Sequence, residues 1–187
     1  MLPSEFDLTG RVALVTGAGT GIGRATARLL AERGADVAIC GRRMEKLEEA
    51  AAHIRETGRK ALAVPVDVRR PEDCRRLMQT VGDAFGKIDI LINNAGGAHG
   101  HVALAKMDLT KWDRDVQLNL NSAMYCSQIS PACSTVIFSL PYALTDAHNR
   151  PRYAMKFLAS APPLNRVVTG PIWSSNMHIA LNDTLRL

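Results

Sequence analysis

The sequence lacks the features that would place it in a membrane or in an export pathway. Its 187 residues contain no apolar run close to the roughly 18 residues that a membrane-spanning helix requires. Its opening residues, MLPSEFD, show no basic region followed by an apolar one, as a signal peptide would. We therefore expect no membrane partner, no signal peptide and a cytoplasmic location.

A cysteine pattern typical of metal sites or of disulfide frameworks is also missing. The four cysteines form no C-x-x-C pair, and none lies near a histidine at metal-ligand spacing. His99 and His101 form an H-x-H pair, but no third ligand stands nearby. We expect reduced cysteines and no bound metal.

No block of basic residues is present, although the formal net charge is +5. Lys and Arg are scattered among Glu and Asp along amphipathic segments, which is typical of solvated helix faces, so nucleic acid is not expected as a partner. What remains is the composition of a soluble globular protein, with 47% apolar and 22% charged residues. The chain length suits one domain with a sizeable core.

Short apolar segments alternate with amphipathic segments through the first half of the chain. We expect strands at 11–16, 35–40, 61–68 and 87–92, and helices at 21–33, at 44–57 and from residue 71 onward. This β-α-β-α-β-α-β order predicts an α/β fold, a doubly wound parallel sheet of the Rossmann type with helices on both faces, in a single domain over 1–187. Such sheets bind ligands beyond the carboxyl ends of their strands.

A glycine-rich turn joins the first expected strand to the first expected helix. Residues 16–23 read T-G-A-G-T-G-I-G, and Gly17, Gly21 and Gly23 allow positive φ angles and the close approach of a ligand. The free N–H groups and the dipole of the new helix attract an anion. The turn therefore predicts a cradle for a nucleotide diphosphate; a purely structural turn is the alternative.

The spacing T-G-x-x-x-G-x-G resembles the cofactor loop of the short-chain dehydrogenase/reductase family. The segment 93–96, N-N-A-G, is similar to a second motif of that family, in which amides join neighbouring strands while small residues leave room for a flat ring. The resemblance is continuous through Gln128 and implies a cofactor half at 1–128 and an abbreviated catalytic and substrate part at 129–187. The cofactor-binding residues that it implies are Gly17, Thr20, Gly21, Ile22, Gly23, Asp67, Val68, Asn93, Ala95, Gly96 and Ser174.

The end of the second expected strand distinguishes the two nicotinamide cofactors. An NAD site uses an acidic side chain there to bind the ribose hydroxyls, whereas a 2′-phosphate needs a cation and no carboxylate. Gly41 stands at the acidic position and Arg42 follows it, which predicts NADP(H) rather than NAD(H). The alternative for Arg42 is a solvated residue at the start of a helix. Asp67 resembles the family aspartate that contacts adenine, and a turn or capping role is its alternative.

The family's chemistry also requires an asparagine and a serine. Asn119, on a helix expected over 109–128, resembles the asparagine that helps to place a water in the proton relay. Ser139, at the end of a strand expected over 135–139, resembles the serine that hydrogen-bonds the substrate oxygen. Both are candidate catalytic residues.

The tyrosine and the lysine of the family are written Y-x-x-x-K, but here Tyr153 and Lys156 form Y-x-x-K. On the helix that we expect there, the shorter spacing moves the lysine by about 100° around the axis relative to the tyrosine. Such a displacement skews the proton relay, since small misplacements of reacting groups cost orders of magnitude in rate. Catalytic roles and plain surface roles are both open for this pair.

The composition changes beyond Gln128. Of the 18 acidic residues, only Asp146 and Asp183 lie there. Residues 166–174 look like the family's sixth strand and following turn, with Ser174 in place of the threonine that touches the nicotinamide amide.

The resemblance implies an NADP(H)-dependent oxidoreductase that interconverts a carbonyl and a secondary alcohol with tyrosine as general acid/base, and a homo-oligomer, dimer or tetramer. The alternative is a catalytically impaired relative that binds nucleotide or pairs with an intact subunit. A last third altered by frameshift or splicing is a third interpretation.

Overall fold

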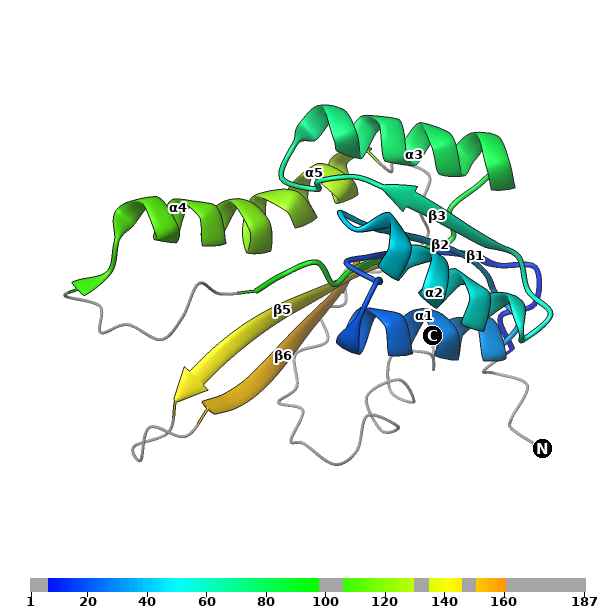
Figure 1. Ribbon diagram of the computed structural model, residues 1–187, viewed down its shortest axis with the longest axis horizontal. Helices are drawn as coiled ribbons and strands as arrows, with labels where there is room; N and C mark the ends of the chain where they lie inside the picture. Colours follow the sequence, from blue (N-terminus) through cyan, green and yellow to red (C-terminus); the bar gives the residue numbers. More distant parts are fainter. Residues whose placement is uncertain (1–6, 98–105, 130–134, 146–150, 161–187) are drawn as a thin grey trace.

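The computed structural model describes residues 7–97, 106–129, 135–145 and 151–160, with side chains described in the first two of these ranges (Figure 1). In chain order the strands and helices are β1 (Val12–Thr16), α1 (Gly21–Glu32), β2 (Asp36–Gly41), α2 (Met44–Arg55), β3 (Ala61–Pro65), α3 (Pro71–Phe85), β4 (Ile90–Asn93), α4 (Leu109–Val116), η3 (Gln117–Asn121), α5 (Ser122–Ile129), β5 (Thr135–Thr145) and β6 (Pro151–Ser160).

The strands form one sheet in the order β3-β2-β1-β4-β5-β6. The first five strands in this order are parallel, and β6 runs antiparallel to β5. The order reverses at β1, because β2 and β3 are added on one side of it and β4 on the other. Such a reversal opens a crevice at the carboxyl ends of the central strands. The doubly wound, Rossmann-type parallel sheet predicted from the sequence is confirmed.

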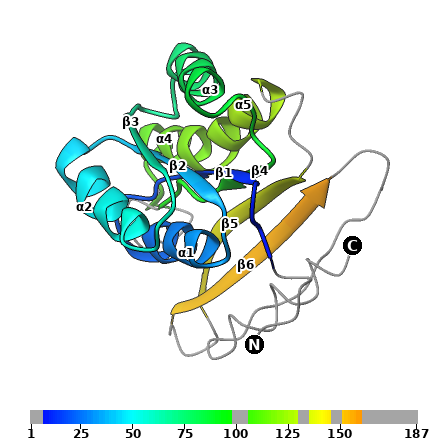
Figure 2. The same cartoon turned by 90° about the vertical axis from the view of Figure 1, so that its right-hand side faces the viewer.

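Helices cover both faces of the sheet. Figure 2 shows α1 and α2 on one face and α3, α4 and α5 on the other. Alternate residues of β1 serve the two faces: Ala13 and Val15 pack in the core beneath α1 and α2, whereas Leu14 packs in the core beneath α3 and α5. All three are fully buried. Burial on both faces explains why these strands read as continuous apolar runs.

The third strand is shorter than predicted. β3 ends at Pro65, three residues before the expected end at residue 68. After Val66 the chain leaves the sheet, and the backbone N–H of Asp67 donates to the Asp73 carboxylate at the start of α3 (3.0 Å). The segment 66–68 therefore becomes a loop beside the carboxyl edge of the sheet.

The long helix predicted over 109–128 is present but is divided into three parts. Between α4 and α5, the segment η3 takes the wider turns of a π-helix over Gln117–Asn121. An apolar period of 3.6 residues continues through such a short segment, so the sequence pattern does not reveal it.

The expectation of a helix carrying Tyr153 and Lys156 is wrong. Both residues lie in β6, which pairs with β5 over its full length of 10 residues. β5 itself continues to Thr145, beyond the predicted strand end at residue 139. The physical reason is non-local, because β5 would otherwise present unpaired backbone N–H and C=O groups at a sheet edge. The sixth strand expected at 166–174 lies outside the described residues.

Candidate functional site

The glycine loop between β1 and α1 needs glycine at two kinds of position. Gly17 and Gly21 have φ angles of 66° and 59°, in the left-handed region that side chains rarely adopt. Gly23 has no such angle, but a Cβ built on it would collide with the Asn94 amide and lie 2.7 Å from the Gly17 carbonyl oxygen. The loop is therefore packed against the end of β4.

The first turn of α1 is open toward this loop. Its N-cap residue, Thr20, is exposed and makes no side-chain capping hydrogen bond, and the first turn contains no acidic residue. The first N–H groups of a helix without a capping side chain are free to bind an anion, and the helix dipole favours negative charge there. This local geometry fits a phosphate group.

Thr16 and Asn94 join β1 to β4 behind the loop. The buried Thr16 hydroxyl accepts hydrogen bonds from the backbone N–H groups of Asn94 (3.0 Å) and Ala95 (2.9 Å). The Asn94 amide in turn donates to the carbonyl oxygens of Thr16 (2.9 Å) and Gly17 (3.3 Å). The second asparagine of N-N-A-G thus joins the strands, as the motif predicts. Asn93 is buried behind it and donates to the Ser127 hydroxyl (3.0 Å).

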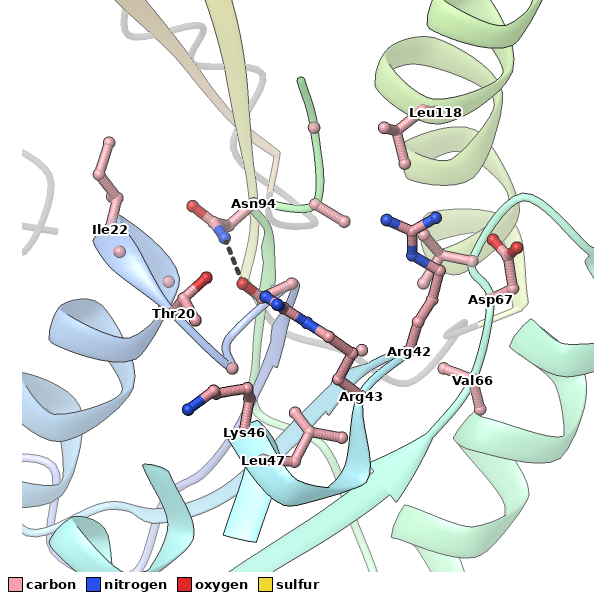
Figure 3. A pocket seen from close by; sticks show the side chains of 18 residues that line it. Thr20, Ile22, Arg42, Arg43, Lys46, Leu47, Val66, Asp67, Asn94 and Leu118 are labelled. Atoms are coloured by element: carbon pink, nitrogen blue, oxygen red, sulfur yellow. Dashed lines mark hydrogen bonds between the residues drawn. The ribbon is translucent and has the colours of Figure 1, made fainter. Parts of the chain in front are cut away.

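These elements surround an open cleft of about 500 Å³ at the carboxyl edge of the sheet (Figure 3). It brings together most residues that the sequence assigned to a cofactor, namely Gly17, Thr20, Gly21, Ile22, Gly23, Arg42, Asp67, Val68, Ala95 and Gly96. Asn93 is not among the lining residues, and Ser174 lies outside the described part of the chain.

Several lining residues were not assigned to the cofactor from the sequence. Gly19, Gly41 and Asn94 belong to the motifs used there, whereas Arg43, Lys46, Leu47, Val66 and Leu118 were not used. Lys46 lies in the first turn of α2, four residues after Arg42, so its position was a signal that could have been used. Leu118 had no signal apart from being next to Asn119.

Three cations line the cleft after β2. In Figure 3 the Arg42 side chain extends toward Asp67, whereas Arg43 runs across the cleft toward Thr20. Lys46, in the first turn of α2, forms an ion pair with Glu49 (2.7 Å) on the same helix. This side of the cleft is therefore suited to an anionic group.

Asp67, which lies beside Arg42 in the cleft (Figure 3), is held by Arg69. The Arg69 guanidinium donates to both carboxylate oxygens, and its backbone N–H donates to one of them (3.1 Å). The hydrogen bonds from the Arg69 side chain lower the pKa of Asp67, and the positive charge of Arg42 acts in the same direction. Asp67 is therefore an ionised carboxylate with a fixed orientation. It lines the cleft and also accepts a hydrogen bond from the backbone of its own turn.

Asn119 holds the loop after β4. Its amide donates to the carbonyl oxygen of Gly97 (2.7 Å), and its side-chain oxygen accepts from the Gly97 N–H (3.0 Å). The same amide also donates to the carbonyl oxygen of Asp115, one turn earlier (2.8 Å). The described role of Asn119 is to position this loop, and water placement stays a prediction.

The other three catalytic candidates are described by their backbone alone. Tyr153 pairs with Ala143, whereas Ser139 pairs with Phe157. Because Phe157 is four residues along β6 from Tyr153, the backbones of Tyr153 and Ser139 are offset by about 13 Å along the strands. Lys156 follows Tyr153 by three residues of extended chain rather than by one helical turn.

Within the described residues, no group of three or more His, Cys, Asp or Glu side chains could hold a metal ion. None of the described helices is both long and apolar enough to cross a bilayer.

A doubly wound sheet with a glycine loop, an open helix N-terminus and a cleft at the strand-order reversal is typical of dinucleotide-binding proteins. Residues 11–132 match the family model described as short chain dehydrogenase. The chain belongs to the short-chain dehydrogenase/reductase family, an oxidoreductase family.

Curated relatives and solved structures agree with this assignment. The chain is 42% identical over 118 residues to the cis-4-hydroxycyclohexanecarboxylate dehydrogenase of Sinomonas cyclohexanicum, which covers 63% of this chain and 47% of that protein. It is similar to the Pseudomonas aeruginosa RhlG/NADP active-site complex, with a TM-score of 0.66, 37% identity and coverage of 71% and 51% of the two chains. NAD+-bound xylitol dehydrogenase gives a TM-score of 0.64 at 36% identity, with coverage of 66% and 47%. The chain spans about half the length of the curated relatives it matches.

Proposed function

We propose that this chain binds NADP(H) and acts as an oxidoreductase of the short-chain type, interconverting a carbonyl and a secondary alcohol. The observation that carries the proposal is the set of cations, Arg42, Arg43 and Lys46, along the cleft beside Gly41. A 2′-phosphate is favoured where cations replace the acidic side chain that binds ribose hydroxyls. Of the two solved structures named above, one is an NADP complex and the other an NAD+ complex, so they support a nicotinamide cofactor of either kind.

In this proposal each part of the cleft contacts one part of the cofactor. The diphosphate would bind at the glycine loop and the open N-terminus of α1, and the adenosine would lie between Arg42 and Asp67. Ala95 and Gly96 would leave room for the nicotinamide ribose. The bound cofactor would supply or accept a hydride at carbon.

The proposed proton chemistry rests on the C-terminal candidates. Tyr153 would exchange a proton with the substrate oxygen, Ser139 would hydrogen-bond that oxygen, and Lys156 would stabilise the deprotonated tyrosine. Asn119 would connect them to water. The substrate would be a small carbonyl or alcohol, and a cytoplasmic location is proposed with it.

A charge substitution at Gly41 tests the cofactor preference. A Cβ built on Gly41 meets Leu47 Cδ2 at 3.5 Å, an ordinary contact, so a side chain fits there. Gly41→Asp places a carboxylate beside the proposed 2′-phosphate, and we expect NADPH to bind at least tenfold more weakly while NADH binding is kept or improved. Isothermal titration calorimetry measures both constants.

Gly41→Ala is the matched control, because it adds the same Cβ without charge. We expect it to leave the ratio of NADPH to NADH affinity within about twofold of the wild-type ratio, as for a surface substitution that removes no interaction. An unchanged ratio in Gly41→Asp would mean that the 2′-phosphate does not bind beside this residue.

A second candidate function is a catalytically silent nucleotide-binding or subunit-pairing module. It is favoured by the offset of about 13 Å between the backbones of Tyr153 and Ser139, because acid–base groups must reach one reacting atom within about 3 Å. NADPH oxidation measured across a panel of ketones and aldehydes separates the two candidates. Turnover that is lost in Tyr153→Phe supports the enzyme, whereas NADPH binding without turnover supports the silent module.

Self-association is proposed for the face formed by α4, η3 and α5. Trp112, Leu120 and Met124 on this face are 50%, 59% and 62% exposed. Large apolar side chains gathered on one helix face mark protein interaction sites. A second copy of this chain is the proposed partner.

A further inference from the structure

The π-helical segment η3 reaches the cleft region with three consecutive side chains. Leu118 lines the cleft directly, Asn119 holds Gly97 beyond β4, and Gln117 reaches the loop between β3 and α3. Short π-helical turns interrupt regular helices and are frequent at functional sites. Asn119 and Leu118 belong to the site already described, whereas Gln117 has no role in it.

Gln117 is half-buried, and both ends of its amide are used. The amide nitrogen donates to the backbone carbonyl oxygen of Arg69 (3.0 Å) and lies 3.4 Å from the Tyr125 hydroxyl. The side-chain oxygen accepts a hydrogen bond from the Asn121 amide (2.7 Å), one turn further along. Asn121 therefore fixes which end of the Gln117 amide faces Arg69, so the contact is oriented and not incidental.

The residue that Gln117 holds is the one that orients Asp67. Arg69 binds the Asp67 carboxylate through its side chain and its backbone N–H. Side chains of α3 also hold this loop, because the Asp73 carboxylate accepts from the Asp67 N–H and the Cys74 thiol donates to the Val68 carbonyl oxygen. Gln117 adds a bond from the π-helical segment η3, 48 residues further along the chain.

We infer that Gln117 is a positioning residue for the adenine end of the cofactor, acting through Arg69 on Asp67. The inference rests on the proposed nucleotide function and extends it to a residue outside the cleft lining. In this view η3 positions both ends of the cleft, the adenine end through Gln117 and the nicotinamide end through Asn119. The effects of Gln117 and Asn119 can be separated, because a ligand that contains only the adenine end of the cofactor depends on Gln117 alone.

The test compares two ligands on the full chain by calorimetry, below the unfolding temperature of every variant. NADPH spans the whole cleft, and adenosine 2′,5′-bisphosphate occupies only the adenine end. We expect Gln117→Leu to weaken both ligands by the same factor of about five, the value of one lost hydrogen bond. Asn119→Leu should weaken NADPH alone and leave the bisphosphate within about twofold.

Two further variants separate positioning from stability. Gln117→Glu keeps the size of the side chain and the oxygen that faces Asn121 but removes the donor to Arg69, so it should reproduce the loss of affinity. Gln79→Leu, at an exposed glutamine of α3, should change neither affinity. Thermal unfolding of each variant shows whether an affinity loss follows a stability loss.

Each outcome has one meaning. Equal weakening of both ligands in Gln117→Leu and Gln117→Glu supports the inference. Unchanged affinities in these variants overturn it, even if their unfolding temperatures fall, because a purely structural residue would behave in that way. If the wild-type chain binds neither ligand, the proposed function itself fails, and the failure is seen before any variant is made.

Discussion

Replacing Gly23 by alanine tests the packing of the glycine loop, because two effects of opposite sign compete there. Gly23 is a buried residue in the first turn of α1 and has no positive φ angle. In an open helix, Gly→Ala stabilises by about 1 kcal/mol through helix propensity. At Gly23, however, the new methyl group would meet the Asn94 amide, the Gly17 carbonyl oxygen at 2.7 Å and Ala18 Cα at 3.0 Å.

The steric cost is expected to win. Two of these three contacts are backbone atoms, which cannot turn aside, and overpacking of a tight site costs about 1–3 kcal/mol. Displacing the Asn94 amide also breaks its hydrogen bonds to Thr16 and Gly17, each worth about 1 kcal/mol. After subtraction of the propensity gain, we expect a net loss of about 2–4 kcal/mol in the free energy of unfolding.

The assay is urea unfolding followed by circular dichroism, with Gly82→Ala as the matched control. Gly82 lies inside α3, and a Cβ built on it meets nothing within 4 Å. Gly82→Ala should therefore increase the free energy of unfolding by up to about 1 kcal/mol, which raises the urea midpoint. A Gly23→Ala chain that is as stable as the wild type, or more so, would refute the packing of α1 against β4 described above.

Three further predictions follow from the same contacts. Thr16→Val removes the hydroxyl that accepts two backbone N–H groups after β4, and should cost about 2–4 kcal/mol in urea unfolding, whereas Thr16→Ser should recover most of the loss. Because Arg69 binds its carboxylate, Asp67 has a pKa in the folded state that is below its ordinary value. The ionised carboxylate therefore stabilises the fold above the unfolded-state pKa of about 3.9, and this stabilisation is lost as pH falls through the folded-state pKa. In Asp67→Asn, the free energy of unfolding should therefore fall less than in the wild type between neutral and acid pH. If both chains lose the same stability, the pairing of Asp67 with Arg69 does not stabilise the fold. Trp112→Glu places a charge on the exposed apolar face of α4, so sedimentation velocity should show an oligomer for the wild type and a monomer for the variant. If the wild type is itself a monomer, the proposed interface does not exist.

The cofactor half of the fold could be predicted because its signals are local. Apolar runs such as 12–15 and the glycines at 17, 21 and 23 report on backbone conformation within a few residues, and the structure confirms the sheet that they predicted. The cleft residues after β1, β2 and β4 follow from the same logic, since the carboxyl ends of parallel strands meet at one edge.

The remaining features depend on partners far away in the sequence. Tyr153 and Lys156 were expected in a helix, but strand pairing with β5 determines their conformation, and β propensity is strongly context-dependent. Gln117 could not be found from its neighbours, because its partner Arg69 lies 48 residues earlier. The ion pair between Asp67 and Arg69 is local in sequence, yet only the turn after β3 brings the two side chains together.

The most direct test of the central claim, an NADP(H) site at the strand-order reversal, is the ratio of NADPH to NADH affinity at low and high salt. If Arg42, Arg43 and Lys46 bind a 2′-phosphate, NADPH should bind at least tenfold more tightly than NADH in dilute buffer. The ratio should fall as salt screens these exposed charges, while the NADH constant changes little. A ratio of about one at low salt, or tighter binding of NADH, would contradict the claim.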